Sequence, residues 1–144
     1  MLALISLLAL AADPVSEAGL KELKSLEGEW YLERLDAEGK MNLINPNDPA
    51  SRPVITIKGP NWKISNSDQT IVVALIDPSV TPRLIDLKIP DGDAKPNLRE
   101  GIYRVEDERL FICLYVGAAR ERPANFDRAG SDQTVQAVLI RKKD

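Results

Sequence analysis

The chain contains no histidine and one cysteine, Cys113, among its 144 residues. The usual zinc sites, Ser-His-Asp triads and Cys-His pairs therefore cannot be built within it. This removes most hydrolase mechanisms. Our expectation is that the chain has no catalytic residue, no metal site and no cofactor. A single cysteine also excludes an internal disulfide. Its position in the apolar run LFICLY predicts a small buried side chain rather than a reactive thiol.

The chain also lacks an excess of positive charge. The 19 basic residues are outnumbered by 22 acidic residues, which gives a formal net charge of -3. Binding to a phosphate backbone needs clustered lysine and arginine on a net basic face, so nucleic acid is excluded as a partner. The length and the 44% content of hydrophobic residues indicate a single globular domain with one core.

The first apolar run, MLALISLLALAA, opens the chain and is followed by an acidic residue and a proline. Its small-x-small sequence at 9–11 predicts a signal peptide over residues 1–11. The run is short and lacks a basic start, which a start codon placed too far downstream would explain. The alternatives are a membrane span, for which the run is too short, and a buried helix of the mature domain. We expect an exported protein (periplasmic, envelope or extracellular) whose mature form has no stable membrane span.

The remainder of the chain changes from helical to strand periodicity at Gly28. Residues 12–27 carry leucines at helical spacing after Ser16, a candidate N-cap, and predict a short N-terminal helical segment. Residues 28–144 then contain eight strand-like runs separated by turn residues. These runs lie at 30–35, 54–58, 62–65, 69–77, 83–89, 101–106, 109–115 and 134–141.

This pattern predicts an all-β domain. A loop is expected at residues 42–53, which contain three prolines and three asparagines. No second helical pattern is long enough for a parallel crossover, so the strands form an antiparallel meander. Eight strands can close into an up-and-down barrel that has no sheet edges. An open sandwich is the alternative.

The sequence at Gly28, Glu29 and Trp30 resembles the Gly-x-Trp motif of the lipocalin and fatty-acid-binding superfamily. The segments LEGEW, GIYRVEDERLFICL and ERPANF, in this order, resemble a conserved hypothetical domain that is abundant in planctomycete bacteria. The resemblance implies a lipocalin-like barrel, exported or attached to other modules, and carries no activity over to the chain. It also implies that Trp30 closes one end of the barrel, that Gly28 precedes it, and that Arg141 lies across its ring.

The interior of this barrel is expected to be aliphatic. Period-two alternation places Ile85, Leu87 and Ile112 on the inner face, and no polar side chain stands out at the predicted inward positions. Such side chains fill a solid core readily, and they can also line a cavity for a weakly specified apolar ligand. The sequence leaves both arrangements open.

The segment from Arg122 to Phe126 lies in the long connection before the last strand and permits two interpretations. In the first, it covers the mouth of the barrel, where Arg120 and Arg122 receive an anionic head group and Phe126 contacts the tail of a ligand. In the second, Phe126 docks on the barrel rim and the arginines pair with the neighbouring carboxylates of Glu121 or Asp127.

The function expected from these features is non-enzymatic binding. The partner is a small apolar or amphipathic molecule inside the barrel, or an envelope protein at its rim. One alternative is a protein-interaction domain with a solid core. The other is an enzyme using carboxylates and arginines, which requires Asp or Glu side chains that face inward.

Overall fold

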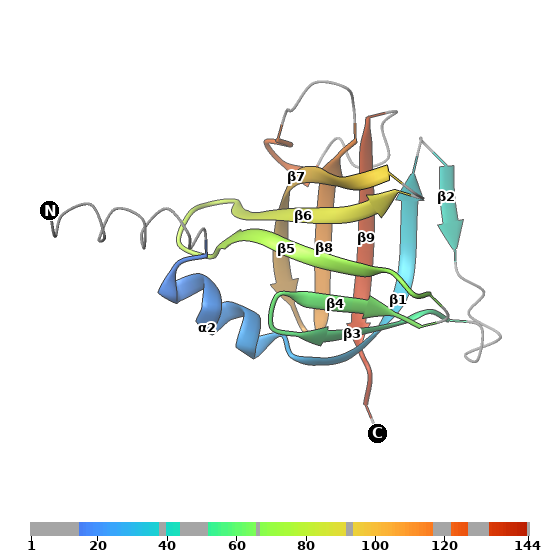
Figure 1. The fold of residues 1–144 in the computed structure, drawn as a ribbon, viewed down its shortest axis with the longest axis horizontal. Helices are drawn as coiled ribbons and strands as arrows, with labels where there is room; N and C mark the ends of the chain where they lie inside the picture. The colour runs from blue at the N-terminus through green and yellow to red at the C-terminus, as the bar shows by residue number, and fades with distance from the viewer. Residues whose placement is uncertain are drawn as a thin grey trace, which may run out of the picture.

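A computed structural model describes residues 15–37, 40–43, 52–65, 67–91, 94–116, 122–126 and 133–143 (Figure 1). The expected signal peptide at 1–11 lies outside these residues. One helix, α2 (Glu17–Ser25), precedes nine strands in the described part of the chain. The strands are β1 (Gly28–Ala37), β2 (Lys40–Leu43), β3 (Val54–Lys58), β4 (Asn61–Ile64), β5 (Thr70–Asp77), β6 (Arg83–Asp91), β7 (Ala94–Glu106), β8 (Arg109–Tyr115) and β9 (Thr134–Arg141).

The strands form an eight-stranded antiparallel barrel. From β3 to β9 each strand pairs with the next in the chain, β1 pairs with β3, and a further pairing of β1 with β9 closes the ring. Figure 1 shows β3 to β6 crossing in front of the upright strands β8, β9 and β1. The predicted all-β, up-and-down barrel with a short N-terminal helix is therefore confirmed.

Two features of the sheet differ from the sequence prediction. The strand β2 pairs with the second half of β1, on the edge whose first half pairs with β3, and it lies outside the ring. It was not expected, because the loop was predicted to start at Asn42, which belongs to β2. The strand β7 begins at Ala94 rather than at Gly101, and this longer strand brings additional side chains to the barrel wall.

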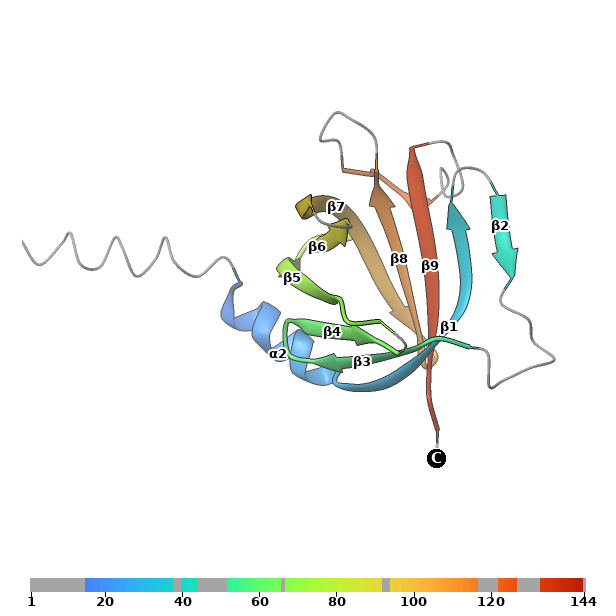
Figure 2. The same ribbon diagram turned by 45° about the vertical axis from the view of Figure 1, so that its right-hand side comes forward.

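The helix forms as its sequence predicts. The hydroxyl of Ser16, the N-cap, accepts a hydrogen bond from the backbone N–H of Gly19 at 3.1 Å. The helix buries Leu23, and Leu26 directly after it is also buried in the core. Figures 1 and 2 place α2 beside the ends of β3, β4 and β5, with β2 on the opposite side of the barrel. We call the end of the barrel covered by α2 the closed end.

The inner faces of the strands form one hydrophobic core. Ile85 is fully buried, and Leu87 and Ile112 are 3% exposed, so all three lie where the alternation predicts them. Cys113 alternates with the inward-facing Ile112 and so lies on the outer face of β8, where it is also buried, as its apolar run predicts. No helix in the described residues is long and apolar enough to cross a membrane.

Candidate functional site at the open end of the barrel

The closed end of the barrel is sealed around Trp30, which has no exposed surface. Its indole Nε1 donates a hydrogen bond to the Leu26 carbonyl at 2.9 Å. The guanidinium of Arg141 lies 4.3 Å from the centroid of the Trp30 ring and donates to the carbonyls of Ser25 and Glu27, each at 3.1 Å. Arg141 thus ties the last strand to carbonyls at the C-terminal end of the helix and just after it, which need donors.

Gly28 lies at the closed end, where the chain turns from α2 into β1. Its φ of 134° lies in a region that L-residues rarely adopt. A Cβ at this position would also lie 3.3 Å from Nη1 of Arg141. The structure therefore brings Gly28, Trp30 and Arg141 together at one end of the barrel, in the arrangement that the lipocalin resemblance implies.

The opposite end, which we call the open end, is where β4 and β6 finish and β5 and β9 begin. Inner-face side chains on this half of the strands pack against the core but remain partly exposed. They include Ile64, Ile71, Ile89 and Ala137. The inner face is therefore less completely buried at this end than at the closed end.

A cation lies on the inner face at the open end. Arg99 of β7 pairs directly with Leu87 of β6, and direct cross-strand partners point to the same side of a sheet. Since Leu87 is part of the core, Arg99 also faces inward. Its Nη1 donates to the carbonyl of Val116, just after β8, at 3.3 Å. Among the described side chains, no carboxylate forms an ion pair with Arg99.

The inner face also carries other polar groups near its two ends. Asn97 is the direct partner of Ile89 at the open end, and Tyr103 belongs to the core near the closed end. The expectation that no polar side chain stands out at inward positions is therefore wrong. Strand alternation extended back from Tyr103 places Arg99 and Asn97 on the inner face as well. The proline at position 96 instead made this region resemble a loop.

The hydroxyl of Tyr103 belongs to a cluster at the closed end. It donates to Oε2 of Glu22 on the helix at 2.6 Å, and Nη1 of Arg83 lies 3.3 Å from the same oxygen. Burial, and next the hydrogen bond to Glu22, raise the pKa of Tyr103 far above its ordinary value. The phenol therefore stays protonated over the whole physiological range and acts as a hydrogen-bond donor that fastens α2 to the barrel.

Arg122 lies on the outer wall of the barrel. Its Nη1 donates to Oδ1 of Asp86 at 2.6 Å and to the Gly101 carbonyl at 2.7 Å, and its Nη2 is 3.4 Å from Oε2 of Glu100. Asp86 alternates with the inward-facing Ile85 and Leu87, so it points outward. These partners are far from Arg122 in the sequence, whereas the expected ones, Glu121 and Asp127, lie outside the described residues.

Phe126 is on the same outer surface. Its ring centroid lies 4.9 Å from the guanidinium carbon of Arg104, which is also 4.4 Å from the ring centroid of Phe111 on β8. The described segment 122–126 therefore covers the outer face of β6 to β8 rather than the mouth of the barrel. Arg120, the other arginine expected at the mouth, lies outside the described residues.

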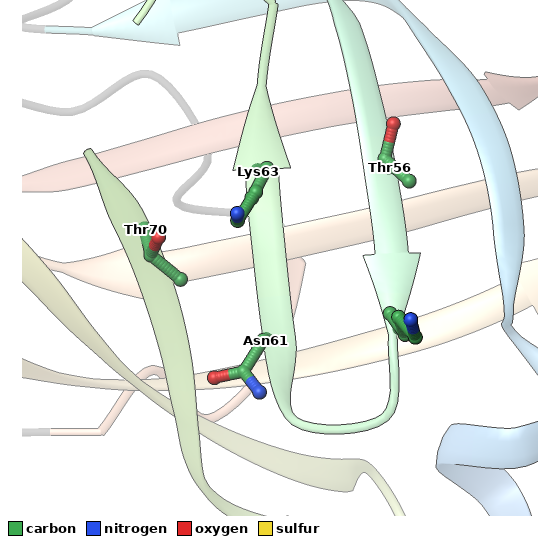
Figure 3. A pocket seen from close by; sticks show the side chains of 5 residues that line it. Thr56, Asn61, Lys63 and Thr70 are labelled. Atoms are coloured by element: carbon green, nitrogen blue, oxygen red, sulfur yellow. The ribbon is translucent and has the colours of Figure 1, made fainter. Parts of the chain in front are cut away.

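A separate hollow of about 490 Å³ lies on the outer face of β3, β4 and β5. Figure 3 shows the side chains that line it, which all lie on the same side of these strands. They are Thr56, Lys58, Asn61, Lys63 and Thr70. Both lysines are exposed, so their charges are well solvated and the hollow holds no buried group that would orient a ligand.

The chemistry available at the open end is binding of an anion next to an apolar interior. Within the described residues, no three histidine, cysteine or acidic side chains are grouped so that they could hold a metal ion.

Comparisons of the chain with protein-family models, with curated proteins and with solved structures find no match.

Proposed function

We propose that the protein binds a small amphipathic anion of the fatty-acid type inside its barrel. The acid group pairs with Arg99 at the open end, and the hydrocarbon chain lies along the aliphatic inner face. The observation that carries this proposal is the inward position of Arg99 among partly exposed apolar side chains. A charged group of this kind orients a ligand that the aliphatic surface alone would select only weakly.

The contrast between Arg99 and Arg122 supports the same conclusion. Arg122 is held on the outer wall by two carboxylates, so its charge is already balanced. Arg99 donates to a neutral backbone carbonyl. A bound carboxylate can therefore form a charge-assisted pair with Arg99 without displacing an acidic side chain of the described residues.

Calorimetric titration with three probes of equal chain length tests the proposal. The probes are dodecanoic acid, dodecanol and the dodecyltrimethylammonium ion. We expect the acid to bind about ten- to a hundredfold more tightly than the alcohol, since charge-assisted hydrogen bonds are worth about 1.5–3 kcal/mol. The cation should bind most weakly. If none of the probes binds, or if the acid has no advantage, the proposal is wrong.

A pair of charge-removing variants locates the site. Arg99→Gln should remove the advantage of the acid over the alcohol and leave the affinity for the alcohol unchanged. Lys88→Gln is the matched control, because Lys88 follows the inward-facing Leu87 on β6 and is exposed on the outer wall. Lys88→Gln should bind all three probes as the unaltered protein does. An equal loss of acid binding in both variants would indicate a general effect of net charge instead of a site.

Export of the protein is a further part of this proposal. Amino-terminal sequencing of the protein purified from the envelope and secreted fractions of its source cells tests it. A mature chain that starts at Ala12 supports export, and an intact leader in the cytoplasmic fraction contradicts it.

A further inference from the structure

The indole N–H of Trp62 is a buried donor that has no acceptor among the described residues. Trp62 is on β4, where it pairs with Ile57 and Ile71, and it is 2% exposed within the core. Its Nε1 exposes less than 1 Å² and finds no hydrogen-bond partner among the described residues. The other tryptophan, Trp30, is equally buried, but its Nε1 is bonded to the Leu26 carbonyl.

An unsatisfied donor of this kind is uncommon in a protein core. Most buried N–H groups have a partner, and an exception calls for an explanation, such as local strain, a functional role, or a water, ion or ligand that supplies the acceptor. The direct cross-strand partners of Trp62 are isoleucines, which offer no side-chain acceptor. A molecule that brings an acceptor atom to Trp62 would therefore relieve the penalty of this unsatisfied donor.

Two isoleucines lie next to Trp62 on the inner face, toward the open end of the barrel. Ile64 is the next inner-face residue of β4 toward the open end, and Ile71 is the direct partner of Trp62 on β5. Both are partly exposed. Both pack against the core, so a ligand chain would have to displace these two side chains to reach the indole.

We infer that the barrel selects anions with an uncharged oxygen acceptor along the hydrocarbon chain, such as oxo fatty acids, and that this oxygen accepts a hydrogen bond from Trp62. The inference rests on the proposed function, because Arg99 holds the acid group. It adds a second polar contact farther inside the barrel. The two polar contacts fix the distance along the ligand between its acid group and its oxygen acceptor. The site therefore distinguishes positional isomers of the ligand.

The experiment compares dodecanoic acid with its oxo derivatives that carry the carbonyl at successive positions. In the unaltered protein, we expect one isomer or two adjacent isomers to bind about tenfold more tightly than the parent acid, the usual size of one satisfied buried donor. Trp62→Phe should reduce this ratio to about one. Arg99→Gln should weaken the parent acid and the preferred isomer by the same factor.

Two additional measurements keep the test independent of folding defects. Benzothienylalanine at position 62 replaces the N–H with sulfur in a ring of nearly the same shape, and it should abolish the preference as Trp62→Phe does. The carbonyl stretching frequency of the bound isomer should be lower in the unaltered protein than in either variant. A preference that survives in both variants overturns the role of Trp62.

The outcomes separate this inference from the proposed function. If the parent acid and all its oxo isomers bind equally to the unaltered protein, the inference is wrong while anion binding stands. If dodecanoic acid does not bind, or if it binds no more tightly than the alcohol, the proposed function itself is wrong.

Discussion

Asp86 of β6 and Glu100 of β7 are direct cross-strand partners on the outer face of the barrel. Like charges in this position destabilise a sheet unless a cation lies between them. Arg122 provides that cation, with its guanidinium bonded to both carboxylates and to the carbonyl of Gly101. The side chain of Arg122 is 23% exposed, so the group is partly shielded from solvent.

Replacement of Arg122 by glutamine is expected to lower the free energy of unfolding by about 1–3 kcal/mol, because it leaves two partly buried carboxylates facing each other. Chemical denaturation measures this value. Arg109→Gln is the control, since Arg109 pairs with Glu33 in a more exposed ion pair and should cost less than about 1 kcal/mol. Adding Glu100→Gln to Arg122→Gln should restore part of the loss. Equal effects of the two arginine variants would contradict this account.

The two tryptophans are a matched pair for a second prediction. Trp30 and Trp62 are both almost fully buried, but Trp30 donates a hydrogen bond and contacts Arg141, whereas the indole N–H of Trp62 has no partner among the described residues. Trp30→Phe is therefore expected to lower the free energy of unfolding by about 1–3 kcal/mol more than Trp62→Phe. Thermal and chemical denaturation of both variants check this difference. A larger loss in Trp62→Phe would show that its N–H has an acceptor in solution.

The barrel could be predicted from sequence because its signals are local. Alternation around Ile85 and Leu87 identifies the inner face of one strand, and turn residues separate most of the runs. The motif around Trp30 indicated the end that α2 covers. Signals of this kind need only neighbouring residues, and they were sufficient for the strand order and most of the core.

The polar groups could not be predicted in the same way because their positions depend on long-range pairing. Arg122 pairs with Asp86 across 36 residues of sequence, although charged residues closer in the chain were the expected partners. Arg99 was missed because Pro96 made the first half of β7 resemble a loop in the sequence. The missing acceptor of Trp62 is a property of its neighbours across the sheet, and no local pattern reveals it.

The buried thiol of Cys113 gives a third prediction. Burial raises the pKa of Cys113 to about 11, and its side chain is inaccessible. The thiolate is the reactive form, so the native protein should react with Ellman's reagent at pH 8 about a hundredfold or more slowly than the protein unfolded in guanidinium. Absorbance of the released chromophore measures both rates. Rapid reaction of the native protein would show that the outer face of β8 opens in solution.

Tyr103 and Glu22 predict the behaviour of the protein in alkali. The folded protein keeps Tyr103 protonated because burial and the hydrogen bond to Glu22 raise its pKa, whereas a tyrosine in the unfolded chain ionises near pH 10, at about its reference pKa. Above that pH the unfolded state binds fewer protons than the folded state. The stabilisation contributed by the phenol is therefore fully present below about pH 10 and is lost as the pH rises further.

Tyr103→Phe tests this linkage directly. At pH 7 the variant should be less stable by about 1–2 kcal/mol, since it removes a partly buried hydrogen bond to a carboxylate. The difference in the free energy of unfolding between the two proteins should shrink as the pH rises above about 10, by up to about 1.4 kcal/mol per pH unit. Tyr115→Phe is the control, because the hydroxyl of Tyr115 donates to Gln133 in an exposed hydrogen bond. A constant difference for Tyr103→Phe across this pH range would mean that the phenol ionises alike in both states, contrary to its place between α2 and the barrel.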